Sequence, residues 1–170
     1  MKKSLVLVLL CLCMLGGCAT ARLYPVKGPL SLQTPLPVYK AKMTQAPMFP
    51  SGNFSAVLGD GEVCKGKWEL VFRSKARKPA APGAVSSTQS LAADWDTVYG
   101  TGYYSFKVLS ASSFVRAVAT GNRGTILNVE MYLDDPSANA PISRNDLTKI
   151  REMAGVGEDN KGNIYKLVFR

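Results

Sequence analysis

The chain contains no histidine in its 170 residues. Ser-His-Asp and Cys-His nucleophile systems need an imidazole to carry the proton, and most zinc sites need one as a ligand, so these kinds of site are excluded. The G-x-S-x-G elbow of serine hydrolases, the S-x-x-K pair of penicillin-recognising enzymes, the phosphate-binding loop and the dinucleotide-binding glycine motif are missing as well. These absences predict a protein that is not an enzyme and that binds no cofactor and no metal ion.

A hydrophobic run long enough to span a bilayer is also lacking, because a membrane-spanning helix needs roughly 20 apolar residues. The N-terminal sequence MKKSLVLVLLCLCMLGGC has two lysines, a short apolar stretch and then two glycines. This order is typical of an export signal peptide. Leu15-Gly16-Gly17-Cys18 matches the lipobox of bacterial lipoprotein precursors, which predicts removal of residues 1–17 and attachment of lipid to the thiol of Cys18.

The residues after Cys18 bear on where the chain is sent. Ala19 occupies the position that helps to sort Gram-negative lipoproteins, and alanine there resembles an outer-membrane address. We therefore expect a lipid-anchored protein of the cell envelope at the outer membrane; periplasmic and surface exposure both stay open. Ala19-Thr20-Ala21 is also an A-x-A site, so the alternative is ordinary cleavage after Ala21, which would release a soluble protein starting at Arg22.

Few cysteines remain once the four in the sequence are placed. Cys11 and Cys13 lie in the expected signal peptide, and Cys18 is the expected lipid acceptor. Only Cys64 is left, so an intramolecular disulfide is excluded in the processed chain. Cys64 lies in a strand-like run, where a small buried hydrophobe is favoured over a reactive thiol.

Acidic residues are outnumbered by basic ones, 12 to 21, for a formal charge of +9. Loss of Lys2 and Lys3 with the signal peptide leaves about +7, a balance that favours anionic partners. We expect a membrane, bound through lipid at Cys18, together with an anionic envelope component or an envelope protein. The export signal argues against nucleic acid, and the sequence does not fix the oligomeric state.

Six of the ten prolines fall within residues 22–50. This composition predicts an extended tether, because proline-rich segments favour the polyproline conformation. The expected organisation is a signal peptide over residues 1–17, a lipidated N-terminus and tether over 18–50, and a β-rich domain over 51–170. Within the tether, the alternating stretch from Val38 to Met43 has the pattern of an edge strand.

The rest of the chain has the period-two alternation of β-strands. Residues 54–72 read as a hairpin around the turn Gly59-Asp60-Gly61. Further strands are expected at 103–109, 114–120 and 125–133. A short helix is expected at 91–99, a second helical turn at 143–146, and a loop at 74–90.

Two turns follow one rule, x-Asn-[Arg/Lys]-Gly-[Thr/Asn]-Ile, at residues 121–126 and 159–164. Asn and Gly readily adopt the positive φ of tight hairpin turns. The repetition predicts a mainly β fold, a single antiparallel sheet of repeated hairpins with one or two short helices, and leaves open whether the sheet curls into a barrel. The second copy faintly resembles a calcium loop, but Lys161 stands where an oxygen ligand is required, so a turn is the interpretation.

The lipobox, SGNFSAVLGDGEVCKGKW, TGNRGTILNVEMY and the terminal DNKGNIYKLVF together resemble a group of small bacterial lipoproteins with no assigned biochemical activity. The resemblance covers residues 51–170 except the 74–90 loop. Its motifs are turns and strands, so it implies a β fold and supplies no catalytic residue.

The remaining candidates for chemistry are carboxylates and aromatic rings. Asp94 and Asp96 flank a tryptophan, and Asp134 and Asp135 are adjacent; a hydrolase would need two carboxyls facing one cleft. An aromatic set could stack on a sugar or pack a helix on a sheet: Trp95, Tyr99, Tyr103, Tyr104 and Phe106.

Three functions follow as hypotheses. The first is a non-catalytic envelope lipoprotein that acts in binding or assembly. The second is a carrier of a small lipid or glycan in a curled sheet, which needs an apolar cavity of roughly 300 Å³ or more. The third is a hydrolase that depends on the paired carboxylates.

Overall fold

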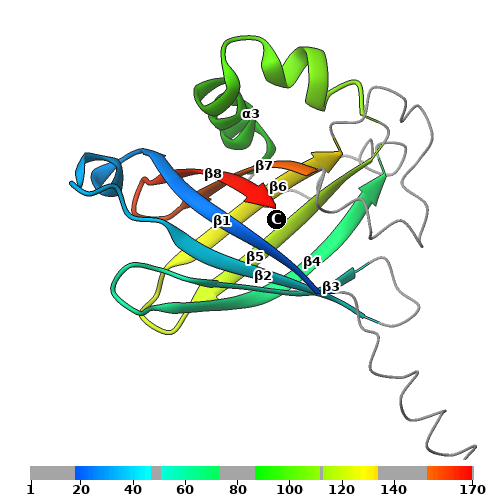
Figure 1. Cartoon of the computed structure of the whole chain (residues 1–170). Helices are drawn as coiled ribbons and strands as arrows, with labels where there is room; N and C mark the ends of the chain where they lie inside the picture. Colours follow the sequence, from blue (N-terminus) through cyan, green and yellow to red (C-terminus); the bar gives the residue numbers. More distant parts are fainter. Residues whose placement is uncertain (1–17, 47–50, 73–86, 112, 134–152, 170) are drawn as a thin grey trace, which may run out of the picture.

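Eight antiparallel strands close into a barrel in the computed structural model (Figure 1). The structure describes residues 18–46, 51–72, 87–111, 113–133 and 153–169. Each strand pairs with the next along the chain, and β1 also pairs with β8. The strands are β1 (Cys18–Lys27), β2 (Tyr39–Gln45), β3 (Ser51–Val57), β4 (Val63–Phe72), β5 (Ser113–Gly121), β6 (Ile126–Leu133), β7 (Met153–Asp159) and β8 (Ile164–Phe169). The predicted antiparallel sheet is confirmed, and closure leaves it without a free edge.

The predicted tether is wrong, because residues 18–45 supply β1 and β2, the strands that close the barrel. Pro25 lies beside a register shift in the β1–β8 pairing, where a missing N–H is tolerated. Pro29 begins the 3-10 helix η1 (Pro29–Leu32) in the connection between β1 and β2. The β-rich domain therefore includes residues 18–45, which were expected to precede it.

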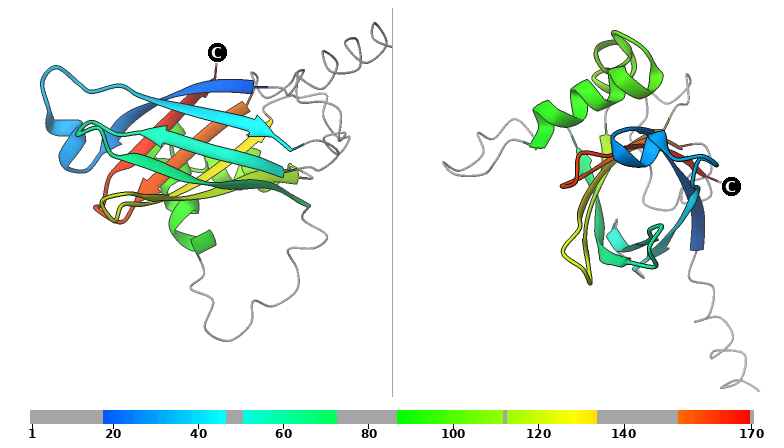
Figure 2. Two further views of the ribbon diagram at one scale, coloured as in Figure 1. Left: turned by 90° about the horizontal axis from the view of Figure 1, so that it is seen from below. Right: turned by 90° about the vertical axis from the view of Figure 1, so that its left-hand side faces the viewer.

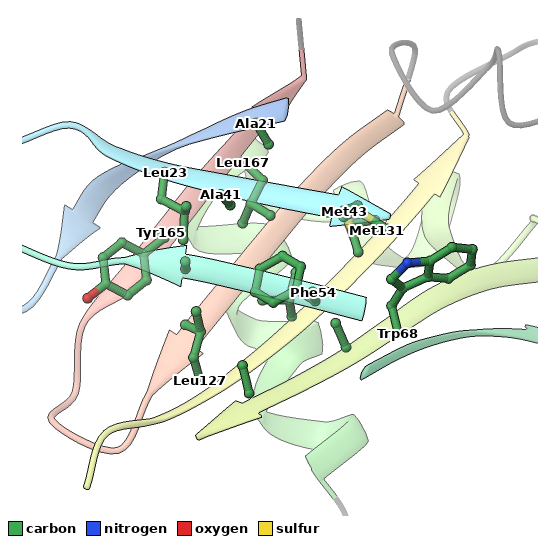
Figure 3. Packing of buried hydrophobic residues seen from close by; sticks show 14 of the residues in the cluster. Ala21, Leu23, Ala41, Met43, Phe54, Trp68, Leu127, Met131, Tyr165 and Leu167 are labelled. Atoms are coloured by element: carbon green, nitrogen blue, oxygen red, sulfur yellow. The ribbon is translucent and has the colours of Figure 1, made fainter. Parts of the chain in front are cut away.

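The barrel interior is filled by alternate side chains from all eight strands (Figure 3). Large residues such as Phe54 and Trp68 share the interior with small ones such as Ala117 and Ala119, and this mixture of sizes fills the narrow core of a small barrel. Cys64 is fully buried among them, which confirms its interpretation as a core residue, and burial raises the pKa of its thiol.

A second cluster lies outside the barrel, beneath helix α3 (Ser87–Tyr99). The helix packs on β7 and β8, on the side away from β3 (Figure 2). Leu91 and Trp95 are buried against Phe114, Tyr132 and Val156, so the predicted apolar stripe is core packing. The helix begins at Ser87, four residues earlier than expected.

The strand expected at 103–109 is wrong, because a π-helical turn, η2 (Tyr104–Val108), stands there. Gly100 and Gly102 adopt φ values of 107° and 85°, which end α3 and turn the chain back. Asp96 accepts the backbone N–H of Tyr104 at 2.9 Å, and Val108 is buried in the α3 cluster. The helical turn expected at 143–146 and most of the 74–90 loop lie outside the described residues.

The β3–β4, β5–β6 and β7–β8 turns and the β1–β2 connection meet at one end of the barrel, which we call the turn end (at the left in Figure 1). Both expected Asn-Gly turns are confirmed, with Gly124 and Gly162 at positive φ. In each turn the asparagine bonds twice to the first residue of another strand. Asn122 donates its backbone N–H to the carbonyl of Val63 and accepts that residue's N–H on Oδ1, and Asn160 does the same with Ile126. The repeated motif therefore joins neighbouring hairpins.

Candidate functional site

A buried carboxylate connects three turns at the turn end. Glu62, between β3 and β4, is 0% exposed. Its Oε1 accepts the backbone N–H groups of Arg123 and Thr125, both at 3.0 Å. Its Oε2 accepts the hydroxyl of Thr125 and the ammonium of Lys161, the latter at 3.2 Å. The hydrogen bond from the Thr125 hydroxyl is the main cause that lowers the pKa of Glu62 to about 2, so the group is ionised at neutral pH.

A second buried acid, Asp159, holds the β7–β8 turn. Its Oδ1 accepts the backbone N–H groups of Lys161 and Asn163 at 2.9 and 3.0 Å. Its Oδ2 accepts the hydroxyl of Tyr165 at 2.6 Å, and burial together with this bond raises the pKa of Tyr165 above its usual range. Donors within the protein thus bond both oxygens of this carboxylate. The predicted turn is confirmed.

The connection between β1 and β2 folds over these turns. Asn163 accepts the backbone N–H of Leu30 on its Oδ1 at 2.9 Å, which fixes η1 to the β7–β8 turn. Tyr39, at the start of β2, meets Tyr165 edge to face at 6.3 Å. Burial is the main cause that raises the pKa of Tyr39, followed by the charges of Asp60 and Asp159.

Between this connection and the turns is a hollow of about 470 Å³, which we call the turn-end hollow. Prolines and leucines supply its apolar wall, and Asp60, Asp159, Lys161 and Asn163 supply polar groups. Its lining is Pro29, Leu30, Gln33, Pro37, Tyr39, Leu58, Gly59, Asp60, Asp159, Lys161 and Asn163. The hollow is large enough for a small ligand, and both the ring of Tyr39 and Lys161, whose ammonium pairs with Glu62, line it.

The carboxylates proposed for a hydrolase do not converge where the structure describes them. Asp96 is bound to the backbone of η2. Asp94 is 5% exposed, its Oδ2 accepts no hydrogen bond, and its charged neighbours are Glu158 and Lys27. Burial, with the charge of Glu158 second, raises the pKa of Asp94 to about 6. Asp134 and Asp135 lie outside the described residues.

The aromatic set packs a helix on a sheet. Trp95 stacks on Tyr99 and Tyr103 with ring centroids 5.3 and 6.0 Å apart. The indole N–H of Trp95 donates to Glu130 at 2.9 Å. The hydroxyl of Tyr99 bonds the backbone of Gly155. Phe106 is different, because it is 84% exposed on η2.

Sequence reasoning missed Glu62 and Asp159, the two acids that organise the turn end. Both stand beside glycine-containing turns, at Gly59-Asp60-Gly61-Glu62 and Asp159-Asn160-Lys161-Gly162, and that was the available signal. The position of Glu62 does not reveal its partners, because they come from turns about 60 to 100 residues away. The partners of Asp159 are local, two to six residues further along the chain, so the sequence around its turn contained them.

Cys18 is exposed at the opposite end of β1 from the turn-end hollow. Within the described parts of the chain, no three metal-ligating side chains gather into a group. None of the helices there has the length and apolar character needed to cross a bilayer.

Comparisons with protein-family models, curated proteins and solved structures give no match for this chain. The resemblance to small bacterial lipoproteins therefore stays a prediction.

Proposed function

We propose that the chain is a non-catalytic lipoprotein of the cell envelope, anchored at the outer membrane through Cys18, which binds its partner at the turn-end hollow. The observation that carries the proposal is the placement of Cys18 and the hollow at opposite ends of one closed barrel. β1 joins the two ends over ten residues, which corresponds to roughly 30 Å. An anchor at Cys18 leaves the hollow accessible.

The pairing of β1 supports cleavage before Cys18 over cleavage after Ala21. Residues 18–21 pair with Thr44, Met43, Lys42 and Ala41 of β2. The side chains of Ala19 and Ala21 are buried in the barrel core. A chain starting at Arg22 would lose these pairs and leave part of β2 unpaired, whereas a chain starting at Cys18 keeps them.

If the chain carries a small ligand, the turn-end hollow suits that ligand better than the barrel interior does. Side chains from all eight strands occupy the barrel interior where the structure describes it, as in other small barrels. The turn-end hollow, at about 470 Å³, exceeds the roughly 300 Å³ that a small-molecule site needs. Its polar groups, aromatic ring and leucines suit a small ligand with one hydroxyl-rich part and one apolar part. This second candidate function shares the site of the first.

Two experiments test the anchor and the hollow separately. Metabolic palmitate labelling should mark the chain and not Cys18→Ser, with outer-membrane fractionation showing the corresponding loss; label that persists in Cys18→Ser refutes the anchor.

For the hollow, a photo-crosslinking residue at Gln33 should give adducts in cells, and the same residue at the exposed wall position Val118 should not. Lys161→Met should weaken the Gln33 adducts. Equal adducts from both positions, unaffected by Lys161→Met, would refute the hollow as the binding site.

A further inference from the structure

One outer face of the barrel carries five cations. Arg22 points outward from β1, Lys40 and Lys42 from β2, and Lys65 and Lys67 from β4, and we call these five residues the basic face. The only outward-facing acid among the described residues of β1–β4 is Glu69, which pairs with Arg116 on β5. None of the five takes part in a described ion pair; those pairs lie at the turn end.

The strand register concentrates this charge. Arg22 stands directly opposite Lys40, and like charges in that position destabilise a sheet. Lys42 and Lys65 both pair with Ser55, one from each side, so their backbones are roughly 10 Å apart. A hydroxyl between two ammonium groups suits a phosphate oxygen, because lysine and serine both donate hydrogen bonds.

The opposite side of the barrel carries acids beside the cations Lys107 and Lys166. α3 covers β7 and β8 there (Figure 2). Asp94 and Asp96 lie on that helix, and Glu158 on β7 beneath it. The barrel is thus charged asymmetrically, and an anionic surface attracts one side of it more than the other.

The expected lipid attachment point lies at the corner of the basic face. Cys18 is exposed and pairs with Thr44, which pairs with Asn53, which pairs with Lys67. These four residues form one row across β1–β4, so Cys18 and Lys67 are three strand spacings apart, roughly 14 Å. Acyl chains on Cys18 would keep the basic face within reach of the surface into which they insert, which matters because screening limits attraction to about 8 Å at physiological salt.

We infer that the basic face docks the barrel on its side against the anionic phospholipid head groups of the membrane that holds its lipid anchor. This inference rests on the proposed anchoring at Cys18, because the anchor is the reason to expect a membrane rather than a soluble anionic polymer as the partner. The lipid sets the distance, and the cations set which side of the barrel faces the bilayer. In this pose the turn-end hollow opens along the membrane surface, and α3 faces away from it.

The first experiment needs no lipid modification and so tests the face independently of the anchor. The chain from residue 18, with Cys18→Ser, contains all eight strands. It should sediment with vesicles of phosphatidylcholine and phosphatidylglycerol and not with phosphatidylcholine alone. Lys42→Gln combined with Lys65→Gln should lower the vesicle partition coefficient by about thirtyfold, because each lysine contributes about fivefold and the two factors multiply. The matched control, Lys27→Gln with Lys107→Gln, removes the same charge outside the basic face and should have a much smaller effect.

Equal losses from the two double variants would mean that net charge alone acts, and would overturn the inference. Binding to lipopolysaccharide without binding to phosphatidylglycerol vesicles would assign the face to that polymer and would also overturn it. A failed anchor gives a different result, since palmitate labelling would then be negative while vesicle binding by the basic face remained.

The second experiment measures the pose of the lipid-modified chain reconstituted into vesicles. An amine-acylating reagent followed by peptide mass mapping reports the reactivity of each lysine. Lys42, Lys65 and Lys67 should be protected in phosphatidylglycerol vesicles relative to phosphatidylcholine vesicles, and high salt should remove the protection. Lys27 and Lys107 should react equally in both. Uniform reactivity of all lysines would refute the docked pose.

Discussion

Glu62 and Thr125 are 63 residues apart in the sequence and joined by two hydrogen bonds, one from the threonine backbone and one from its hydroxyl. The pair ties the β3–β4 turn to the β5–β6 turn, and the ammonium of Lys161 adds the β7–β8 turn. A closed barrel already fixes its strands, so the contact's own effect is to hold three turns in one arrangement around the turn-end hollow.

Glu62→Gln should therefore destabilise the protein by about 2–3 kcal/mol, because hydrogen bonds to a buried charged group are stronger than neutral ones and the amide presents a donor to Thr125 or Arg123. Urea unfolding followed by tryptophan fluorescence gives the free energy of unfolding. The matched control is Glu69→Gln, an exposed acid on β4, which should change stability by less than about 0.5 kcal/mol. Equal effects of the two substitutions would contradict the role of the buried network.

Acid should weaken the barrel through the same residue. The pKa of Glu62 is lowered to about 2 in the folded state, from an ordinary value of 4.5. Its contribution to stability is therefore complete above about pH 4.5 and is lost as pH falls toward 2. Stability measured across this window should fall less steeply for Glu62→Gln than for the parent chain. Parallel curves would show that another group controls the acid response.

Protonation of Asp94 should have the opposite effect on stability from protonation of Glu62. Burial of this α3 residue raises its pKa from 3.8 to about 6, so the folded state holds the proton more tightly than the unfolded chain does. The protein should gain stability as pH falls from above 6 toward 4, and Asp94→Asn should stabilise it at neutral pH by on the order of 2 kcal/mol.

Thermal unfolding of Asp94→Asn at neutral and mildly acid pH measures this effect. Asp96→Asn is the control on the same helix and should destabilise, because the carboxylate of Asp96 accepts the N–H of Tyr104. If Asp94→Asn is less stable than the parent chain at neutral pH, the carboxylate of Asp94 does not destabilise the folded state and the prediction is wrong.

The two asparagines of the repeated turn motif should have matching effects. Asn122→Ala removes the acceptor for the N–H of Val63, and Asn160→Ala removes the acceptor for the N–H of Ile126. Each substitution should reduce the free energy of unfolding by about 1 kcal/mol, and the double variant should show nearly the sum. Asn53→Ala, at an exposed position on β3, is the control and should be near neutral. No change in either variant would mean that the motif acts only through its backbone.

The turn positions could be predicted because their requirements are local. Gly124 and Gly162 need positive φ, and the residues around them alternate visibly. β1 escaped recognition, and β2 was expected only as an edge strand at Val38–Met43 within the tether. The inward positions of both strands include alanines, Ala19, Ala21 and Ala41, which form a weak hydrophobic pattern next to prolines. The need for small side chains at these positions follows from the narrow closed barrel, and the local sequence does not contain that information.

The candidate site was harder to predict than the fold. The contacts of Glu62 depend on which turns gather at one end of the barrel, and barrel closure decides that. The π-helical turn at η2 was missed for a related reason. Residues 103–109 alternate like a strand, and packing of Val108 under α3 overrides the pattern.

Residues 18–21 form the first part of β1. Deleting them tests directly whether this segment is a strand of the barrel or a tether. Removing them should lower the free energy of unfolding by about 3–5 kcal/mol, since four strand pairs and the buried side chains of Ala19 and Ala21 are lost. The comparison is between the chain from residue 18, with Cys18→Ser, and the chain from Arg22, by urea unfolding with the indole of Trp68 in the core as reporter. Thr20→Ala is the matched control, because its side chain points outward and the strand stays intact. Equal stability of the long and short chains would restore the tether interpretation and remove the structural support for cleavage before Cys18.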